Sequence, residues 1–213
     1  MSVFDTDSVV STASLIPVLQ LDNPETAVPI AQTLVESGLT VLEVTLRTPG
    51  ALACIEAIAR ALPEAEVGAG TLLAPEQVSS LVDAGGRFAV SPGLTLPLFE
   101  ACQAAKLPWL PGVVTPSELL SALGLGFLNC KFFPAAAYGG TATLKSFAGP
   151  FPAARFCPTG GITPANLADY LRLSNVVCAG GSWLVTREDA IQPDLDAIRA
   201  RATEALAVAG AVS

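Results

Sequence analysis

Histidine is absent from the 213 residues of the sequence. Without an imidazole, Ser-His-Asp and Cys-His catalysis are excluded, as is any zinc or iron site that needs histidine ligands. Positive charge is also scarce, since 11 lysines and arginines face 19 acidic residues and give a net charge of −8. This balance argues against nucleic acids and anionic membranes as partners.

Long apolar runs are missing as well, although 51% of the residues are hydrophobic and only 14% are charged. The most apolar stretch, residues 96–114, is interrupted by Glu100, Lys106 and three prolines, so it offers no run of about 18 residues for a membrane span. The first ten residues contain Asp5 and Asp7 but no lysine or arginine, unlike a secretory leader. We therefore expect a cytoplasmic protein with a sizeable apolar core.

Cysteine pairs with metal-site spacing are also lacking. The five cysteines are an odd number, are widely spaced and form no CxxC motif: Cys54, Cys102, Cys130, Cys157 and Cys178. This pattern disfavours both a disulfide framework and a metal site, and it favours free thiols packed as small apolar side chains in a reducing compartment. We expect no cofactor and no metal.

What the sequence does contain is a strict alternation of two patterns. Short apolar or β-branched runs predict strands at 16–19, 41–44, 66–68, 88–90, 109–110, 127–131, 155–157 and 176–178. Ala/Leu-rich amphipathic stretches predict helices at 24–36, 49–62, 75–84, 96–105, 116–123, 141–147, 164–171 and 187–207. Four of these helices begin with proline after a polar residue, which predicts Asn23, Thr48, Thr115 and Thr163 as N-caps.

Alternating strands and helices imply parallel strands joined by crossover helices. Eight such units of roughly 25 residues predict an α/β fold, specifically a closed (β/α)8 TIM barrel. An open doubly wound sheet is the alternative, although no GxGxxG fingerprint follows the first strand. No linker divides the chain, so residues 1–213 are predicted to form a single domain with an N-terminal lead-in segment. The Ala-rich tail beyond Ala202 is expected to fray or to pack on a neighbour.

Two charged residues lie inside apolar strands. Lys131 lies within FLNCKFFPAA, and burial there favours the neutral amine, which can attack a ketone and form a Schiff base. Glu43 lies between Leu42 and Val44, where an unpaired carboxylate is costly unless it has a function such as general acid/base catalysis. A simple ion pair of Glu43 with Lys131 or Arg47 remains an alternative for both residues.

Other unusual residues also fall at the ends of predicted strands, where barrels place their chemistry. Arg47 follows the second strand and could bind a carboxylate. Gly160-Gly161 and Gly180-Gly181-Ser182 end the last two strands, where backbone N–H groups can bind phosphate because glycine allows a close approach. Together these residues indicate an imine-forming barrel enzyme with an anionic substrate, although glycines also serve ordinary turns.

Six motifs in the correct order resemble 2-keto-3-deoxy-6-phosphogluconate (KDPG) aldolase, which is also called 4-hydroxy-2-oxoglutarate (KHG) aldolase. The motifs extend over about residues 16–184 and are EVTLRT (43–48), GAGT (68–71), SPG (91–93), KFFPA (131–135), RFCPTGGI (155–162) and GGSWL (180–184). The resemblance implies cleavage of KDPG to pyruvate and glyceraldehyde 3-phosphate, with KHG as a further substrate. It also implies a homotrimer that needs no metal.

The resemblance assigns roles residue by residue. Lys131 would form the Schiff base and Glu43 would move the proton, while Arg47 and Thr71 would bind the pyruvate carboxylate. Thr159 would help to set stereoselectivity. The remaining residues would bind the phosphate or shape the pocket: Gly160, Gly161, Gly181, Ser182, Pro92 and Phe133. One departure is Gln20, where some relatives carry a basic residue at the end of the first strand.

Three other functions stay open. A 6-phosphogalactonate-type aldolase is a close relative, but it differs from EVTLRT at the Glu43 motif. A metal-dependent pyruvate aldolase would need more carboxylates than the strand ends supply. A non-catalytic phosphate-binding barrel would explain the glycines but not Lys131 and Glu43.

Overall fold

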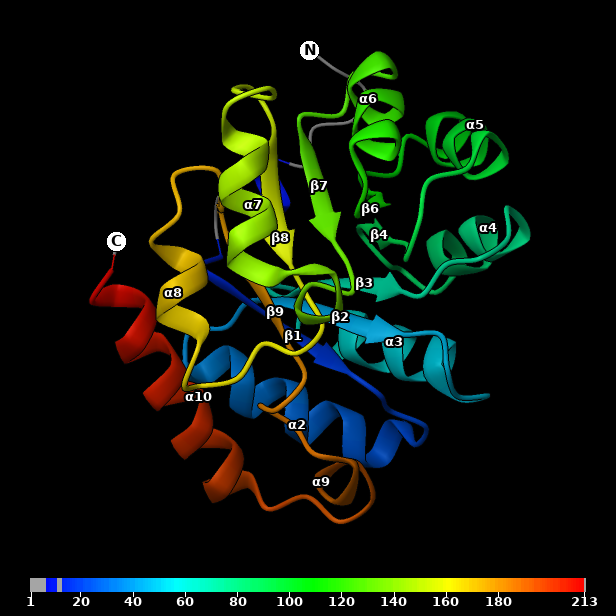
Figure 1. The fold of residues 1–213 in the computed structure, drawn as a ribbon. Helices are drawn as coiled ribbons and strands as arrows, with labels where there is room; N and C mark the ends of the chain where they lie inside the picture. The colour runs from blue at the N-terminus through cyan, green and yellow to red at the C-terminus, as the bar shows by residue number, and fades with distance from the viewer. Residues whose placement is uncertain (1–6, 11–12, 213) are drawn as a thin grey trace.

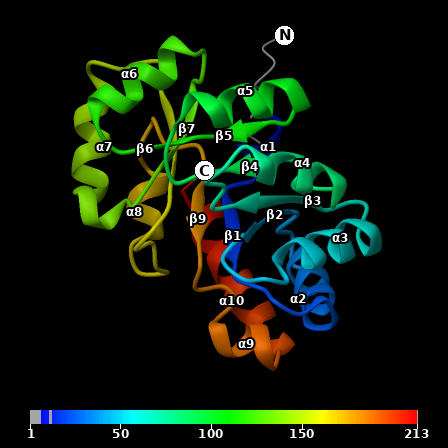
Figure 2. The ribbon, with the colours of Figure 1, turned by 90° about the vertical axis from the view of Figure 1, so that its right-hand side faces the viewer.

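The structure is a computed structural model that describes residues 7–10 and 13–212. Parallel strands form its centre, and helices cover their outer faces (Figures 1 and 2). The strands are β1 (Leu15–Leu19), β2 (Val41–Thr45), β3 (Glu66–Gly70), β4 (Ala89–Val90), β5 (Trp109–Leu110), β6 (Gly112–Val113), β7 (Asn129–Phe132), β8 (Arg155–Pro158) and β9 (Ala179–Gly181). The helices are α1 (Asp7–Val10), α2 (Pro24–Glu36), α3 (Ala51–Ala61), α4 (Glu76–Asp83), α5 (Leu96–Ala105), α6 (Pro116–Gly124), the 3₁₀ turn η1 (Ala136–Tyr138), α7 (Gly140–Ala148), α8 (Leu167–Leu171), α9 (Arg187–Ile191) and α10 (Leu195–Gly210).

The strands pair in two parallel sheets. One sheet has the order β5-β4-β3-β2-β1-β9 and the other the order β6-β7-β8. Two further parallel bridges, Phe156 to Val176 and Thr159 to Gly180, join the β8 region to the chain around β9. The prediction of a parallel α/β fold is therefore confirmed, with a crossover helix between most successive strands.

The core has an inner and an outer part. The inner cluster comes from many different strands and their flanks: Val9, Val10, Ile16, Val41, Phe88, Val90, Leu110, Cys157 and Cys178. The outer cluster packs the strands against the helices, for example Leu42 and Val44 of β2 with Leu34 of α2. Every residue of β2 is buried, so this strand has no solvent-facing side, as is typical of parallel strands covered on both faces.

The expected lead-in segment before the first strand falls partly outside the described residues. Its described part is α1, where Val9 and Val10 are 4% and 2% exposed and belong to the inner cluster. At the other end of the chain, the Ala-rich tail is helical through Gly210 and packs on α2 and α8. Among the described residues, no helix has both the length and the apolar character that a bilayer span requires.

Two predicted elements differ from the structure. The single helix predicted at 187–207 is wrong, because Pro193 separates α9 from α10 and proline lacks the N–H that a helix interior needs. The strand predicted at 176–178 is also wrong, since β9 begins at Ala179, which pairs with Leu15 of β1. Val176 makes only an isolated bridge to Phe156.

Two of the four predicted N-caps are confirmed. The Asn23 side chain accepts a hydrogen bond from Glu25 N, and Thr115 forms a capping box with Glu118.

The other two predicted N-caps are wrong. Thr48 does not cap α3, because its hydroxyl donates to the carbonyl of Leu21 and the helix begins after Gly50. Thr163 does not cap α8, which begins three residues later, after Asn166.

Candidate active site

The predicted site residues gather at the carboxyl ends of the strands. Glu43 lies in β2 and Lys131 in β7, while the others follow strand ends: Arg47 after β2, Thr71 after β3, Pro92 after β4, Phe133 after β7, Thr159, Gly160 and Gly161 after β8, and Ser182 after Gly181, the last residue of β9. Parallel strands end at the same edge of a sheet, so these side chains share one side of the molecule.

Lys131 and Glu43 form a buried ion pair across the interior between the two sheets. Lys131 Nζ lies 3.0 Å from Glu43 Oε1 and 3.5 Å from Oε2. The two residues are 5% and 4% exposed. The ammonium also lies 5.1 Å from the centre of the Phe133 ring, whose face attracts a cation. Glu43 therefore pairs with Lys131, not with Arg47, and the contact is short enough for a proton to pass between amine and carboxylate.

Gly70 makes room for the Glu43 carboxylate, a role that our sequence reasoning missed. A Cβ at this position would lie 2.0 Å from Glu43 Oε1 and 2.7 Å from its Cδ. Glycines in a strand interior often mark such a close approach, and Gly68 and Gly70 alternate within β3. These two alternating glycines are the feature of the sequence from which the role of Gly70 could have been predicted.

Two thiols lie in the inner cluster next to this ion pair. Lys131 is in register with Cys157 of β8, and Cys178 precedes β9. A hydrogen bond with Cys157, burial, and the nearby charge of Glu43 raise the pKa of Cys178 well above its usual value. The Cys178 thiol therefore stays protonated and adds no negative charge beside Glu43.

Arg47 and Thr71 meet at the ends of β2 and β3. Arg47 Nε donates a hydrogen bond of 3.1 Å to Thr71 Oγ1. Thr71 has φ of 62°, a left-handed conformation that is rare and strained for a β-branched residue. Such strain often marks a functional site, and a guanidinium beside a hydroxyl can bind a carboxylate.

The loop that contains Pro92 is fixed against the neighbouring strands. Trp109 Nε1 donates to Ser91 Oγ over 2.9 Å, and Ser91 Oγ donates to the carbonyl of Gly93 over 2.6 Å. Gly112 of β6 passes so close that a Cβ there would lie 2.2 Å from the Pro92 carbonyl oxygen. Pro92 therefore lies in a rigid wall beside β6.

The Thr159 hydroxyl has no hydrogen-bond partner within the part of the chain that the structure describes. The residue is 6% exposed, and Thr159 Oγ1 is the one buried side-chain polar atom in the described residues that lacks a hydrogen bond. A Cβ at Gly180 would lie 2.3 Å from this oxygen, so glycine is needed there. A buried hydroxyl without a partner is costly, and a substrate oxygen could satisfy it.

The glycines after β8 adopt backbone conformations that other residues avoid. Gly160 and Gly161 have φ of 93° and 80°. A Cβ on Gly161 would lie 2.4 Å from Ala136 Cβ. Hydrogen bonds from Ala135 N to the Thr159 carbonyl and from Ala136 N to the Gly160 carbonyl, at 2.8 and 3.0 Å, hold the loop. The loop is thus a preformed turn whose amides could approach an anion closely.

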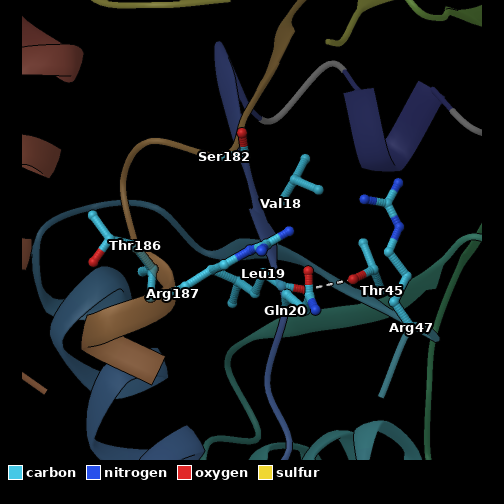
Figure 3. A pocket seen from close by; sticks show the side chains of 9 residues that line it. Val18, Leu19, Gln20, Thr45, Arg47, Ser182, Thr186 and Arg187 are labelled. Carbon is cyan, nitrogen blue, oxygen red and sulfur yellow. Dashed lines mark hydrogen bonds between the residues drawn. The ribbon is translucent and has the colours of Figure 1, made fainter. Parts of the chain in front are cut away.

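A pocket of about 210 Å³ opens above β1, β2 and the end of β9 (Figure 3). Its lining residues are Val18, Leu19, Gln20, Thr45, Arg47, Ser182, Val185, Thr186 and Arg187. Val18, which lines the pocket, is in register with Glu43 on the neighbouring strand. Arg187 was not predicted as a site residue, because a charged residue at the start of a helix is usually exposed to solvent and has no special function. The described residues contain no group of three or more histidine, cysteine, aspartate or glutamate side chains that could hold a metal.

Comparisons with known proteins agree on one family. The family model for KDPG and KHG aldolase matches residues 6–201. The KHG/KDPG aldolase of Escherichia coli K12 is 49% identical over 200 residues, which cover 94% of each chain.

Two solved structures are similar over nearly the whole chain. The KDPG aldolase of Zymomonas mobilis ZM4 with 3-phosphoglycerate is 46% identical, with a TM-score of 0.90 and 96% of each chain covered. The KDPG aldolase of Legionella pneumophila, with pyruvate captured at low pH as a covalent carbinolamine intermediate, is 42% identical, with a TM-score of 0.91 and 98% of each chain covered.

Proposed function

Since the chain belongs to the KDPG and KHG aldolase family, we propose that it is a class I aldolase that cleaves KDPG to pyruvate and glyceraldehyde 3-phosphate. The observation that carries this proposal is the buried contact of 3.0 Å between Lys131 Nζ and Glu43 Oε1. It provides an amine and a proton acceptor in a site with little solvent. The family name and the E. coli relative support KHG as a second substrate, cleaved to pyruvate and glyoxylate.

Lys131 is the proposed nucleophile. Its ammonium passes a proton to Glu43, and the neutral amine adds to the C2 ketone of the substrate to give a carbinolamine. Glu43 then gives this proton to the C2 hydroxyl, which leaves as water, and the resulting protonated imine withdraws electrons from the C3–C4 bond. Support comes from the Legionella relative, in which pyruvate is captured as a covalent carbinolamine. The face of the Phe133 ring would stabilise the cationic imine.

Glu43 is the proposed proton carrier. Its carboxylate takes the proton of the C4 hydroxyl, directly or through water, while the electron pair of the C3–C4 bond moves to form the enamine. Glyceraldehyde 3-phosphate leaves at this step. The carboxyl group then returns a proton to C3, and hydrolysis of the imine releases pyruvate and frees Lys131.

The ends and the middle of the substrate would meet different residues. Arg47 and Thr71 would hold the carboxylate beside the imine, a role supported by their mutual hydrogen bond. The Thr159 hydroxyl would meet a substrate hydroxyl and so contribute to stereoselectivity, which is supported by its missing partner. Pro92 and Phe133 would form the walls, and the phosphate would lie against the amides of Gly160, Gly161, Gly181 and Ser182.

The barrel prediction is part of this proposal. Only Pro111 separates β5 from β6, and the bridges from Phe156 to Val176 and from Thr159 to Gly180 link the other edges of the two sheets. We therefore propose that β5 and β6 act as one strand and that the sheets close into an eight-stranded barrel, built as one domain.

The proposal extends to the oligomeric state and the location of the protein. The family resemblance supports a homotrimer. A cytoplasmic location is supported by the five cysteines, which are all buried and unpaired.

The experiment is a coupled assay on the purified protein, in which lactate dehydrogenase reports pyruvate released from KDPG or KHG. Both substrates should be cleaved, with and without EDTA, and Lys131→Met should abolish cleavage. Lys106→Met is the matched control, because Lys106 is an exposed residue at the end of α5. No pyruvate from either substrate would overturn the proposal, and loss of activity in EDTA would favour a metal-dependent aldolase.

A further inference from the structure

Arg187 differs from the other seven arginines because no hydrogen bond or ion pair of its side chain is found within residues 7–10 and 13–212. Four arginines pair with exposed or half-exposed carboxylates: Arg60 with Glu56, Arg87 with Glu66, Arg172 with Asp169, and Arg199 with Glu36. Arg201 pairs with Asp189, Arg155 donates to two carbonyl oxygens, and Arg47 donates to Thr71. Within the described part of this acidic chain, one guanidinium is thus left without an anionic or carbonyl partner.

This guanidinium faces the pocket above β1. Figure 3 shows the Arg187 side chain extending from the start of α9 toward Val18 and Leu19, with Ser182 and Gln20 on either side. Among the residues that the structure describes, those that line the pocket include two arginines and no carboxylate. In a chain with a net charge of −8, the charged side chains that are found in this lining are thus both positive.

The backbone that carries Arg187 is held firmly. Thr186 and Asp189 form a capping box around it, with Asp189 N donating to Thr186 Oγ1 over 3.1 Å and Thr186 N donating to Asp189 Oδ2 over 2.8 Å. Arg201 of α10 pairs with the same carboxylate. Burial acts to raise the pKa of Asp189. The hydrogen bonds from Thr186 and the charge of Arg201 outweigh burial and hold this pKa below its usual value. The backbone at the start of α9 is thus fixed beside the pocket that the Arg187 side chain lines.

The two arginines of the pocket belong to opposite ends of it. Arg47 is bound to Thr71, beside β2 and β3. Arg187 follows β9, on the side of Ser182, whose neighbour Gly181 is in register with Pro17 of β1. β1 lies between β2 and β9, so the two arginines follow strands on opposite sides of β1.

We propose that Arg187 is a specificity-determining residue that binds the phosphate group of the substrate and so favours KDPG over KHG. This inference rests on the proposed function. A guanidinium can form two parallel hydrogen bonds to phosphate oxygens, and it supplies charge that the amides of Gly181 and Ser182 lack. KHG carries a carboxylate at C5, whereas the phosphate of KDPG is attached through the oxygen on C6. The distal group of KHG is thus nearer to the reacting carbons, and we expect it not to reach Arg187.

The test compares Arg187→Gln, Arg187→Lys and the control Arg60→Gln with the wild-type protein. Arg187 is exposed and its side chain has no partner among the described residues, so its variants should fold normally. Arg60 lies on α3 and makes only a surface contact of 3.9 Å with Glu56. The readouts are kcat and KM for KDPG and for KHG, borohydride trapping of pyruvate, and the affinity for inorganic phosphate by calorimetry.

Arg187→Gln should raise the KM for KDPG by roughly 10- to 100-fold and weaken phosphate binding, because a charge-assisted contact to phosphate is lost. The KM for KHG and the trapping of pyruvate should stay within about twofold of wild type, as should all values for Arg60→Gln. Arg187→Lys should recover part of the loss, since it keeps the charge but not the planar fork.

An unchanged KM for KDPG in Arg187→Gln, or an equal rise for both substrates, would overturn the role of Arg187 while leaving the aldolase intact. If the wild-type protein cleaves neither substrate, the proposed function fails instead. Calorimetry with phosphate then still decides whether Arg187 binds this anion: equal affinities of wild type and Arg187→Gln would refute the inference.

Discussion

Adding one methyl group at Gly70 should disable the reaction without touching a reacting group. The Cβ of Gly70→Ala would lie 2.0 Å from Glu43 Oε1, so the carboxylate must move by about 1.4 Å to reach the 3.4 Å of an ordinary contact. Gly70 is held in β3, which pairs with β2 along its length, so the flexible Glu43 side chain moves and the backbone stays. The movement breaks the 3.0 Å contact with Lys131.

The expected effect follows from the size of this displacement. A misplacement of about 1 Å in a catalytic group typically costs about 10²-fold in rate, so kcat for KDPG should fall by roughly that factor. Overpacking of the buried site should also cost about 1–3 kcal/mol of stability. Steady-state assays and denaturant unfolding measure the two effects separately.

Gly149→Ala is the matched control, because no atom of the described residues lies within 4 Å of a Cβ built there. The double variant Gly70→Ala/Glu43→Gln adds a sharper test: its kcat should equal that of Glu43→Gln alone, since the displaced carboxylate is already gone. A wild-type kcat in Gly70→Ala would refute the role of Gly70 in positioning Glu43.

Three further predictions concern the buried groups. Glu43→Gln should reduce turnover by about 10²–10⁴-fold and slow the exchange of pyruvate methyl protons with solvent, and exchange at the wild-type rate by NMR would show that another group moves the proton. Thr159→Val should not lower the melting temperature, because the lost hydroxyl has no partner among the described residues. The stereochemical discrimination of the enzyme in the aldol direction should fall. A clear drop in melting temperature with unchanged discrimination would contradict this prediction. Burial raises the pKa of Cys54 to about 11 and those of Cys102 and Cys130 to about 12, so native protein should resist iodoacetamide at pH 8. Because these folded-state values exceed the usual 9.0, stability should decline as the pH rises from about 9 toward 12, and rapid alkylation of the native protein would contradict the burial.

The sequence predicts much of the fold because its local signals agree with the tertiary structure. Alternation of apolar runs and amphipathic stretches locates the strands, and Asn23 and Thr115 mark helix starts correctly. The break between α9 and α10 could have been predicted from Pro193, whose conflict with a helix interior is local. The late start of β9 could not, because it depends on where the strand meets Leu15 of β1.

The candidate site also contains some residues that the sequence reveals and others that only the structure reveals. Lys131 and Glu43 are visible in the sequence because charge inside an apolar strand is unusual, and their pairing across the interior agrees with parallel strands ending at one edge. Gly70 and Arg187 depend on the direction of particular side chains. Their importance appears only when the register of β2 with β3 and the lining of the pocket are known.

Borohydride trapping with pyruvate, followed by peptide mass mapping, tests the role of Lys131 most directly. The chain has three lysines, and Lys106 and Lys145 are both exposed, so they serve as internal controls for unspecific labelling. One reduced pyruvyl group should appear on Lys131, with parallel loss of KDPG cleavage. Labelling confined to Lys106 or Lys145, or full activity after stoichiometric labelling of Lys131, would contradict an imine mechanism at this residue.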